Sequence, residues 1–241
     1  MTIADKVVLV TGANRGLGQA LVAEALRRGA KRVYAGSRQP LSHPDERVTP
    51  LTLNVTNAAH IQAAVERVDA LDILINNAGV SVPDELSERS ALEQHLAVNL
   101  YGTLDITQAF LPLLTRRHGA VVNVVSLGAV AAVPVLPSYS ISKAAALSLT
   151  QSLRALLAGR GVSVYAVLPG PIDTDMVREL DIAKTSPEDV ARATLDGVER
   201  GDEEIFPDPM SQLLADGWRA GVAKAMERQN AVLVPAEPIA A

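Results

Sequence analysis

Short, continuously apolar runs alternate with helix-like stretches along this chain of 241 residues. Two of these runs read Val-Val-Leu-Val and Ile-Leu-Ile, without alternation of polar and apolar side chains. Strands of this kind are covered on both faces, as in parallel sheets, and parallel strands need a crossover, usually helical, between them. The chain is therefore predicted to be an α/β protein with a Rossmann-type, doubly wound parallel sheet of about seven strands and helices on both faces.

The predicted elements follow one another without an intervening linker. The strands are Lys6–Val10, Arg32–Gly36, Val48–Asn54, Asp72–Asn76, Ala120–Val125, Val162–Val167 and Glu204–Phe206. The helices are Leu17–Arg28, Ala58–Val68, Ala91–Thr115, Lys143–Leu157 and Pro187–Arg200. Because no glycine- or serine-rich stretch and no repeat divides the chain, residues 1–231 are expected to form a single domain. Residues 232–241 contain two prolines and are expected to be an extended or interface-forming tail.

Composition removes several classes of protein. Cysteine is absent, which excludes disulfides, thiolate metal sites and a cysteine nucleophile. The net charge of −5 provides no basic stripe for phosphates, so nucleic acid is not an expected partner. We expect no signal peptide, and prolines and serines interrupt the uncharged stretch from His118 to Ser142. A cytoplasmic protein without a membrane span is therefore expected.

A glycine-rich turn follows the first strand and reads TGANRGLG over residues 11–18. Glycines let the backbone approach a pyrophosphate closely, and the N-terminus of the following helix presents free N–H groups to it. No Lys-Ser or Lys-Thr pair follows, which disfavours a nucleoside-triphosphate P-loop. Its position directly after a buried strand favours dinucleotide binding over a plain strand-to-helix turn.

Three further residues suggest acid–base chemistry. Tyr139 and Lys143 lie four residues apart at the start of a helical stretch, so they share one face. A nearby cation favours the phenolate form of a tyrosine, so the pair is a candidate for acid–base catalysis. The alternative is that the two residues have no catalytic role and are a half-buried tyrosine beside a solvated lysine. Ser126 ends an apolar strand, at the edge where α/β sheets place ligand groups, and its hydroxyl can stabilise a carbonyl oxygen that gains charge.

Together these motifs resemble the short-chain dehydrogenase/reductase family over about the first 200 residues, in the same order. The matching segments are TGANRGLG at 11–18, NNAG at 76–79, Asn99 within Val-Asn-Leu, Ser126, YSISK at 139–143 and PGPIDT at 169–174. The resemblance implies hydride transfer between a nicotinamide cofactor and a carbonyl or secondary alcohol, here the reduction of a ketone or aldehyde.

The resemblance also implies roles for four catalytic residues. Tyr139 would protonate the carbonyl oxygen, or take the proton during alcohol oxidation. Lys143 would lower the pKa of Tyr139 and hold the nicotinamide ribose. Ser126 would orient the substrate oxygen, and Asn99 would position a water that continues a proton relay from Lys143.

The implied cofactor site draws on four of the matching segments, those at 11–18, 76–79, 139–143 and 169–174, and on the ends of two further strands. It comprises Gly12, Asn14, Arg15, Gly16, Leu17, Gly18, Ser37, Arg38, Asn54, Val55, Asn77, Ala78, Gly79, Tyr139, Lys143, Pro169, Gly170, Ile172 and Thr174. Of these, Ile172 and Thr174 would bind the carboxamide and set which face of the ring delivers hydride. Many relatives carry an aspartate where this chain has Asn54.

The end of the second strand bears on the choice of cofactor. It carries no carboxylate, the group with which NAD enzymes of this fold usually bind the ribose 2′-OH. Instead Arg15, Ser37 and Arg38 offer two guanidinium groups and a hydroxyl for a 2′-phosphate, although either arginine could equally be a solvated surface charge. NADP(H) is therefore expected, with NAD(H) as the alternative.

The expected substrate wall is apolar. It comprises Val80, Leu127, Val130, Val133, Val135, Leu136, Pro171, Met176 and Val177, although core packing is an equal alternative for the valines. Only residues 176–186 separate the PGPIDT segment from the next helix. The short segment predicts an open and permissive site for an apolar carbonyl compound or alcohol.

Competing functions are a nicotinamide-sensing regulatory protein without turnover, or an extended epimerase or dehydratase. The Ser126, Tyr139 and Lys143 set argues against the first, and the short sequence after Phe206 argues against the second. No metal site is expected, because the histidines form no H-E-x-x-H motif. The resemblance implies a homodimer or homotetramer, with a small molecule as the other partner.

Overall fold

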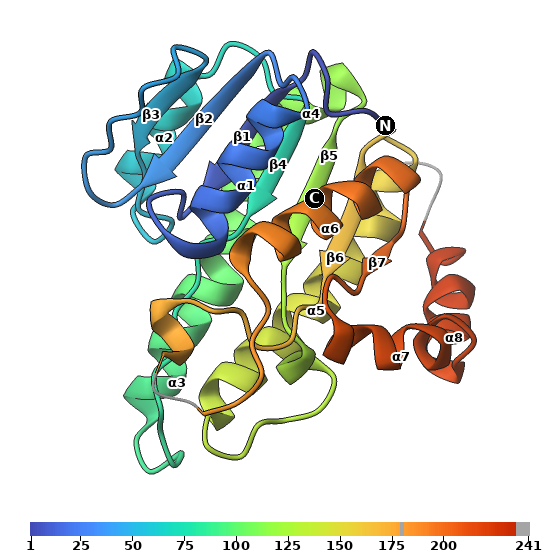
Figure 1. Ribbon diagram of the computed structural model, residues 1–241. Helices are drawn as coiled ribbons and strands as arrows, with labels where there is room; N and C mark the ends of the chain where they lie inside the picture. The colour runs from blue at the N-terminus through green and yellow to red at the C-terminus, as the bar shows by residue number, and fades with distance from the viewer. Residues whose placement is uncertain (179–180, 235–241) are drawn as a thin grey trace.

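The computed structural model describes residues 1–178 and 181–234. In this part of the chain a parallel sheet of seven strands has the order β3-β2-β1-β4-β5-β6-β7 (Figure 1). The strands are β1 (Val7–Thr11), β2 (Arg32–Ser37), β3 (Val48–Thr52), β4 (Ile73–Asn76), β5 (Ala120–Val124), β6 (Ser163–Val167) and β7 (Glu204–Ile205). The chain winds outward from β1 to β3, returns to β4 beside β1, and then winds outward the other way. The predicted doubly wound fold is confirmed.

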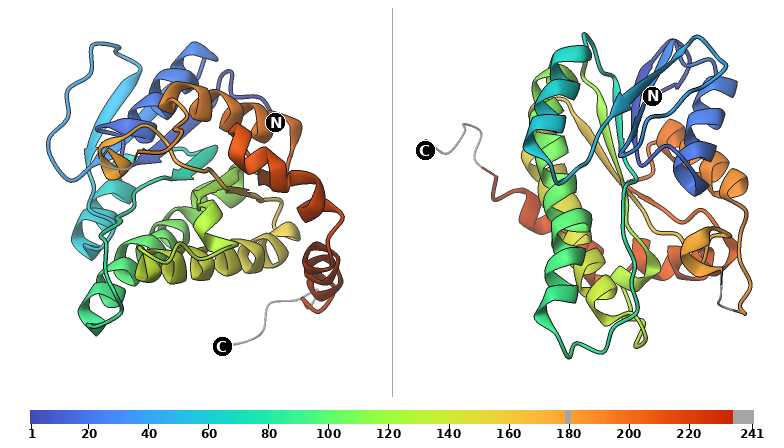
Figure 2. Two further views of the ribbon diagram at one scale, coloured as in Figure 1. Left: turned by 60° about the horizontal axis from the view of Figure 1, so that its bottom comes forward. Right: turned by 90° about the vertical axis from the view of Figure 1, so that its left-hand side faces the viewer.

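Two helical layers enclose the sheet (Figure 2). The helices are α1 (Gly16–Arg27), α2 (Ala58–Arg67), α3 (Arg89–Leu96), α4 (Thr103–Arg117), α5 (Pro137–Ala158), α6 (Pro187–Arg200), α7 (Pro209–Arg219) and α8 (Val222–Ala231). Helices α1 and α6 form one apolar core with the sheet, and α2, α4 and α5 form the other. Val8 and Val10 of β1 enter the first core and Leu9 enters the second. A strand covered on both faces needs apolar side chains at successive positions, which explains the continuous runs.

Two of the predicted helices differ from the observed ones by more than one residue at an end. The predicted helix Ala91–Thr115 is divided into α3, a π-helical turn at Ala97–Gly102 and α4. The predicted helix Lys143–Leu157 begins earlier, at Pro137. Proline is favoured at the first position of a helix, because its missing N–H would have no partner there. Tyr139 consequently lies in the first turn of α5, one turn before Lys143.

Helices α7 and α8 lie in a region without a predicted element. Lys224 of α8 is only 2% exposed, and its Nζ donates to Glu204 at 2.8 Å and to Glu227 at 2.9 Å. Glu204 belongs to β7, and Arg154 of α5 pairs with it at 2.8 Å. Lysines are almost never fully buried unless paired, so this cluster explains why α8 packs against the edge of the sheet.

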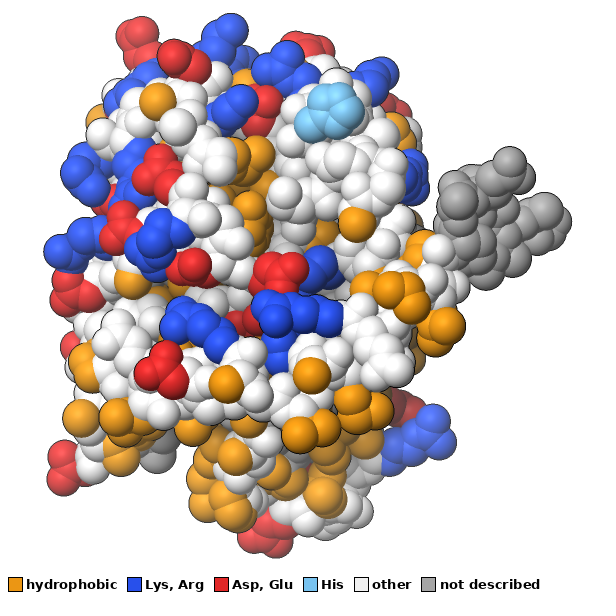
Figure 3. Space-filling model, turned by 90° about the vertical axis from the view of Figure 1, so that its right-hand side faces the viewer, with side chains coloured by type: hydrophobic (Ala, Val, Ile, Leu, Met, Phe, Trp, Pro, Cys, Tyr) orange, Lys and Arg blue, Asp and Glu red, His pale blue; other side chains and the backbone are white. Residues whose placement is uncertain are grey.

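Figure 3 shows the side of the molecule on which α7 and α8 lie. Charged side chains of both signs cover the upper and middle part of this face, and hydrophobic side chains gather toward its lower part. On α7 and α8, Leu213 and Val222 are 84% and 76% exposed. No helix among the described residues is long and apolar enough to cross a membrane. Val232–Val234 follow α8 in a turn, and the rest of the predicted tail, residues 235–241, lies outside the described residues.

Candidate active site

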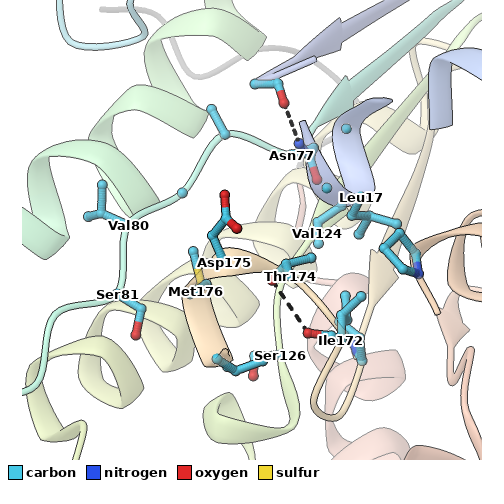
Figure 4. Close-up of a pocket in the computed structure, with 18 of the residues that line it drawn as sticks. Leu17, Asn77, Val80, Ser81, Val124, Ser126, Ile172, Thr174, Asp175 and Met176 are labelled. Carbon is cyan, nitrogen blue, oxygen red and sulfur yellow. Dashed lines mark hydrogen bonds between the residues drawn. The ribbon is translucent and has the colours of Figure 1, made fainter. Parts of the chain in front are cut away.

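A cavity of about 1080 Å³ lies at the carboxyl ends of the central strands. The strand order reverses between β1 and β4 at this edge, and open α/β sheets bind their ligands at such a point. The glycine-rich turn, the segment after β4, the start of α5 and the loop after β6 all contribute to its wall. Figure 4 shows residues from three segments around the same space: Val80 and Ser81 after β4, Ser126 after β5 and Met176 after β6.

The backbone of the glycine-rich turn depends on its glycines. Gly12 and Gly16 have φ values of +66° and +54°, which residues with side chains rarely adopt. A Cβ on Gly18 would lie 2.1 Å from the carbonyl oxygen of Gly12. Among the described residues no side chain caps the N-terminus of α1, and no acidic residue lies in its first turn. Free N–H groups on a closely approachable backbone fit the pyrophosphate of a dinucleotide.

Thr11 and Asn77 join this turn to the segment after β4. The Thr11 hydroxyl accepts hydrogen bonds from the backbone N–H groups of Asn77 and Ala78, each at 3.0 Å. The Asn77 side chain donates to the carbonyl oxygens of Thr11 and Gly12 at 2.9 and 3.2 Å. Asn77 therefore holds one wall of the cavity to the other, in addition to lining it.

Ser126, Tyr139 and Lys143 all face the cavity. Lys143 is 6% exposed, its Nζ donates to the carbonyl oxygen of Val124 at 2.9 Å, and it lies 5.7 Å from the centre of the Tyr139 ring. Burial lowers the pKa of Lys143 to about 8. Burial also raises the pKa of Tyr139, while the neighbouring Ser126 hydroxyl acts to lower it. The expected effect of Lys143 on Tyr139 stays a prediction.

The low pKa of Lys143 predicts a pH-dependent stability. Its ordinary value is 10.5, so above pH 8 the unfolded chain binds more protons than the folded one, and stability rises with pH. Below pH 8 both states are protonated and the cost of burying the charge is constant. Between pH 8 and 10, the free energy of unfolding of the wild type should rise by roughly 1–2 kcal/mol relative to Lys143→Met.

Urea unfolding of both proteins across this range measures the difference, in which contributions from other titrating groups cancel. The pKa of Tyr139 is raised from 10.0, so its opposite effect begins only at higher pH. A difference that stays constant between pH 8 and 10 would show that Lys143 keeps an ordinary pKa in the fold.

Asn99 lies in the π-helical turn between α3 and α4 and is 1% exposed. Its Oδ1 accepts from the N–H of Val80 at 2.9 Å, and its Nδ2 donates to the Val80 carbonyl at 3.0 Å and to Ser142 Oγ at 2.9 Å. π-Helical turns occur frequently at functional sites. Because its amide binds protein groups on both sides, Asn99 holds the cavity wall, and its role in positioning a water stays a prediction.

The predicted nicotinamide segment, residues 169–174, is held by a residue that sequence reasoning did not identify. Asp208 is the N-cap of α7, where its side chain accepts from the N–H of Ser211, and it also accepts from the N–H of Gly170 at 2.8 Å. The only sequence signal is an aspartate before a proline at the start of a helix. Ile172 and Thr185 form an isolated β-bridge, which joins the two ends of the short segment between them.

The residues predicted to bind the 2′-phosphate differ in whether they line the cavity and in whether the protein already occupies their polar groups. Arg38 lines the cavity and forms no ion pair with any described residue. Arg15 also lines it, but pairs with Asp175 at 2.9 Å. Ser37 is buried, and its hydroxyl donates to the carbonyl of Gln39. Asn54 lines the cavity, and its Oδ1 accepts from the N–H and hydroxyl of Thr56.

The substrate side of the cavity is apolar. Of the predicted residues, the structure places in its wall Val80, Leu127, Val133, Leu136, Pro171, Met176 and Val177. Ile182 and Met210, which sequence reasoning missed, also line it. The prediction is wrong for Val130 and Val135, which lie outside the wall because their loop turns them toward solvent, leaving them 40% and 62% exposed.

The doubly wound sheet and the glycine turn at its reversal point define a Rossmann-type dinucleotide-binding protein. The sequence profile described as short chain dehydrogenase matches residues 6–185. The chain belongs to the short-chain dehydrogenase/reductase family, a family of oxidoreductases.

Several relatives support this assignment. A solved short-chain dehydrogenase from Burkholderia cenocepacia, in complex with NADP, is 39% identical, has a TM-score of 0.85, and covers 95% of this chain and 99% of its own. The 3-oxoacyl-[acyl-carrier-protein] reductase FabG of Thermotoga maritima is 36% identical over 197 residues, 75% of this chain and 79% of the relative. An uncharacterized oxidoreductase of Staphylococcus aureus is 33% identical over 211 residues, 80% of this chain and 90% of the relative.

Proposed function

We propose that the protein is an NADP(H)-dependent carbonyl reductase that converts apolar ketones or aldehydes to alcohols. In the reverse direction it oxidises the alcohols to the carbonyl compounds. The observation that carries this proposal is that Ser126, Tyr139 and Lys143 face one cavity with the uncapped N-terminus of α1. Residues 1–231 would act as one unit. The nicotinamide cofactor, when bound, supplies or accepts the hydride.

The residues of the chain supply the proton and the geometry. The Tyr139 hydroxyl donates its proton to the substrate oxygen, and the Ser126 hydroxyl orients that oxygen and stabilises its growing charge. Lys143, held by the Val124 carbonyl at 2.9 Å, places a positive charge beside Tyr139 and favours its deprotonated form after transfer. Asn99 holds the cavity wall at Val80. The proposed proton relay would run from Lys143 to a water that Asn99 positions.

Preference for NADP(H) is supported by the charges near the end of β2. Arg38 lines the cavity there and no carboxylate occupies the end of the strand. The Burkholderia cenocepacia relative was solved in complex with NADP. Arg15 could contribute once it exchanges its partner Asp175 for a phosphate.

Replacing Arg38 by alanine is therefore expected to raise the KM for NADPH by about 10- to 100-fold, the equivalent of one lost charge-assisted hydrogen-bonding group. The KM for NADH should change little, because NADH has no 2′-phosphate. Arg67→Ala, on the exposed end of α2, is the matched control for loss of a surface arginine. Equal loss with both cofactors, or a lower KM for NADH in the wild type, would contradict the proposal.

The apolar wall of the cavity supports the proposed class of substrate. Hydrophobic residues such as Leu136, Met176 and Met210 line the substrate side, and the segment from 176 to 186 is short. The proposed substrate class can be tested by following NADPH consumption with a panel of small aliphatic, cyclic and aromatic ketones and aldehydes. Turnover of several apolar members supports a permissive reductase. Cofactor binding without turnover of any member would favour a sensor, and activity confined to one compound would contradict permissiveness.

We also propose that the protein works in the cytoplasm as a homodimer or homotetramer. Apolar side chains on the helices near the site support a subunit interface, since Tyr101, Ile141 and Leu156 are 54%, 42% and 55% exposed. Light scattering coupled to gel filtration measures the mass in solution, and a monomer at micromolar concentration would contradict the proposal.

A further inference from the structure

His95 is a buried imidazole close to the site to which the proposed reaction assigns no role. It lies at the end of α3, is 0% exposed, and is the one residue of that helix that is fully buried. Its Nδ1 lies 2.7 Å from the carbonyl oxygen of Ala91, one helical turn earlier. A carbonyl can only accept, so Nδ1 carries the proton. Nε2 is then an acceptor, and the N–H of Val82 donates to it at 3.1 Å.

The contact with Val82 belongs to a set that fixes the cavity wall after β4. Asn99, one turn after His95, holds both backbone groups of Val80. Val80 and Ser81 lie in the wall of the cavity, as Figure 4 shows. His95 and Asn99 lie four residues apart and share one helical face. From that face His95 binds Val82 and Asn99 binds Val80, the two ends of this short stretch.

The other side of the same ring meets Tyr139. The two ring centres are 6.4 Å apart and the planes are inclined by 74°, an edge-to-face contact. Such pairs contribute through the electrostatics of the rings as well as through buried area. One side chain thus contacts both the segment that carries the substrate wall and the ring that carries the proposed proton donor.

We propose that His95 is a positioning residue for the reductase reaction. Its Nε2 sets the position of Val80 and Ser81 through Val82, and its edge-to-face contact sets the orientation of the Tyr139 ring. This inference rests on the proposed function, and it assigns no proton transfer to the imidazole.

The two contacts can be separated by substitution. His95→Phe keeps an aromatic ring beside Tyr139 but removes the acceptor for Val82. It should raise the KM for the carbonyl substrate about tenfold with a smaller effect on kcat. His95→Gln can keep an acceptor but removes the ring, so it should lower kcat about three- to tenfold and leave KM near that of the wild type. His95→Leu should show both effects.

NADPH affinity is the control for a general loss of rigidity, because the hydrogen bonds of His95 to Val82 and Ala91 and its ring contact involve, of the predicted cofactor residues, Tyr139 alone. The dissociation constant should stay within about twofold in all three variants, a difference worth less than one hydrogen bond. Gln94→Leu, on the exposed side of the same helix, should match the wild type throughout. Kinetic constants within twofold of wild type in every His95 variant, or parallel loss of NADPH affinity, would overturn the proposal.

Amide hydrogen exchange at Val82 tests the contact independently of turnover. Exchange should accelerate at least about tenfold in His95→Phe and His95→Leu, but not in His95→Gln, because only the first two lack an acceptor. Unchanged exchange in His95→Phe would overturn the inference even if the enzyme is active. A wild type that reduces no carbonyl compound would instead refute the proposed function, while the exchange measurement would still decide whether His95 holds the wall.

Discussion

Replacement of Tyr139 by phenylalanine is expected to lower kcat for carbonyl reduction by about 10²- to 10⁴-fold, the usual contribution of a positioned proton donor. The substitution removes one oxygen and keeps the ring, whose centre lies 6.4 Å from that of His95 in an edge-to-face contact. The wall of the cavity and the cradle at the glycine turn should therefore be unchanged. NADPH binding, measured by fluorescence titration, should stay close to that of the wild type.

Tyr101→Phe is the matched control, since this tyrosine is 54% exposed and lies outside the cavity wall. It should retain full turnover. Turnover of Tyr139→Phe at the wild-type rate would refute the assignment of the proton donor. Loss of NADPH affinity together with turnover would show instead that the variant disturbs the cofactor site.

Gly18→Ala is expected to weaken NADPH binding by roughly 100-fold or more, equivalent to losing one or two charge-assisted hydrogen bonds. A Cβ at this position would lie 2.1 Å from the Gly12 carbonyl oxygen and 2.6 Å from Asn77 Nδ2. Backbone atoms cannot yield as a flexible side chain can, so the turn must move away from the N-terminus of α1. The N–H groups there would then no longer converge on a pyrophosphate.

Gly217→Ala supplies the control for a methyl group added to a helical glycine, because its Cβ would have nothing within 4 Å. It lies inside α7 and should leave NADPH affinity unchanged while raising helix stability slightly. Circular dichroism and thermal unfolding of both variants separate loss of the fold from loss of binding. Wild-type affinity in a folded Gly18→Ala protein would contradict the role given to the turn.

Much of the architecture could be predicted because it depends on local patterns. The continuous apolar run of β1 already implies two covered faces, and Val8 and Leu9 indeed enter opposite cores. Likewise Ser126 follows a strand, and parallel strands bring their carboxyl ends to one edge. The spacing of Tyr139 and Lys143 placed them on one helical face, and the family resemblance implied that Ser126 joins them; all three line one cavity.

Other features depend on contacts between segments that are distant in the sequence. The interruption of the predicted helix at Ala97–Gly102 places Asn99 against Val80, and no local pattern marks this π-helical turn. Ser37 has the right position for a phosphate contact, yet its hydroxyl donates to the carbonyl of Gln39. Val130 and Val135 have the right chemistry for the wall, but their loop exposes them.

From the sequence alone we could predict the doubly wound sheet, the glycine turn at its reversal point and the residues proposed to carry the chemistry. The groups that hold those residues in place became evident only from the fold: His95 contacts Tyr139 and Val82, and Asp208 binds Gly170. Periodicity and strand ends can be predicted because neighbouring residues encode them. The partner of a buried polar group is instead selected only when the packed chain brings distant donors and acceptors within hydrogen-bonding distance.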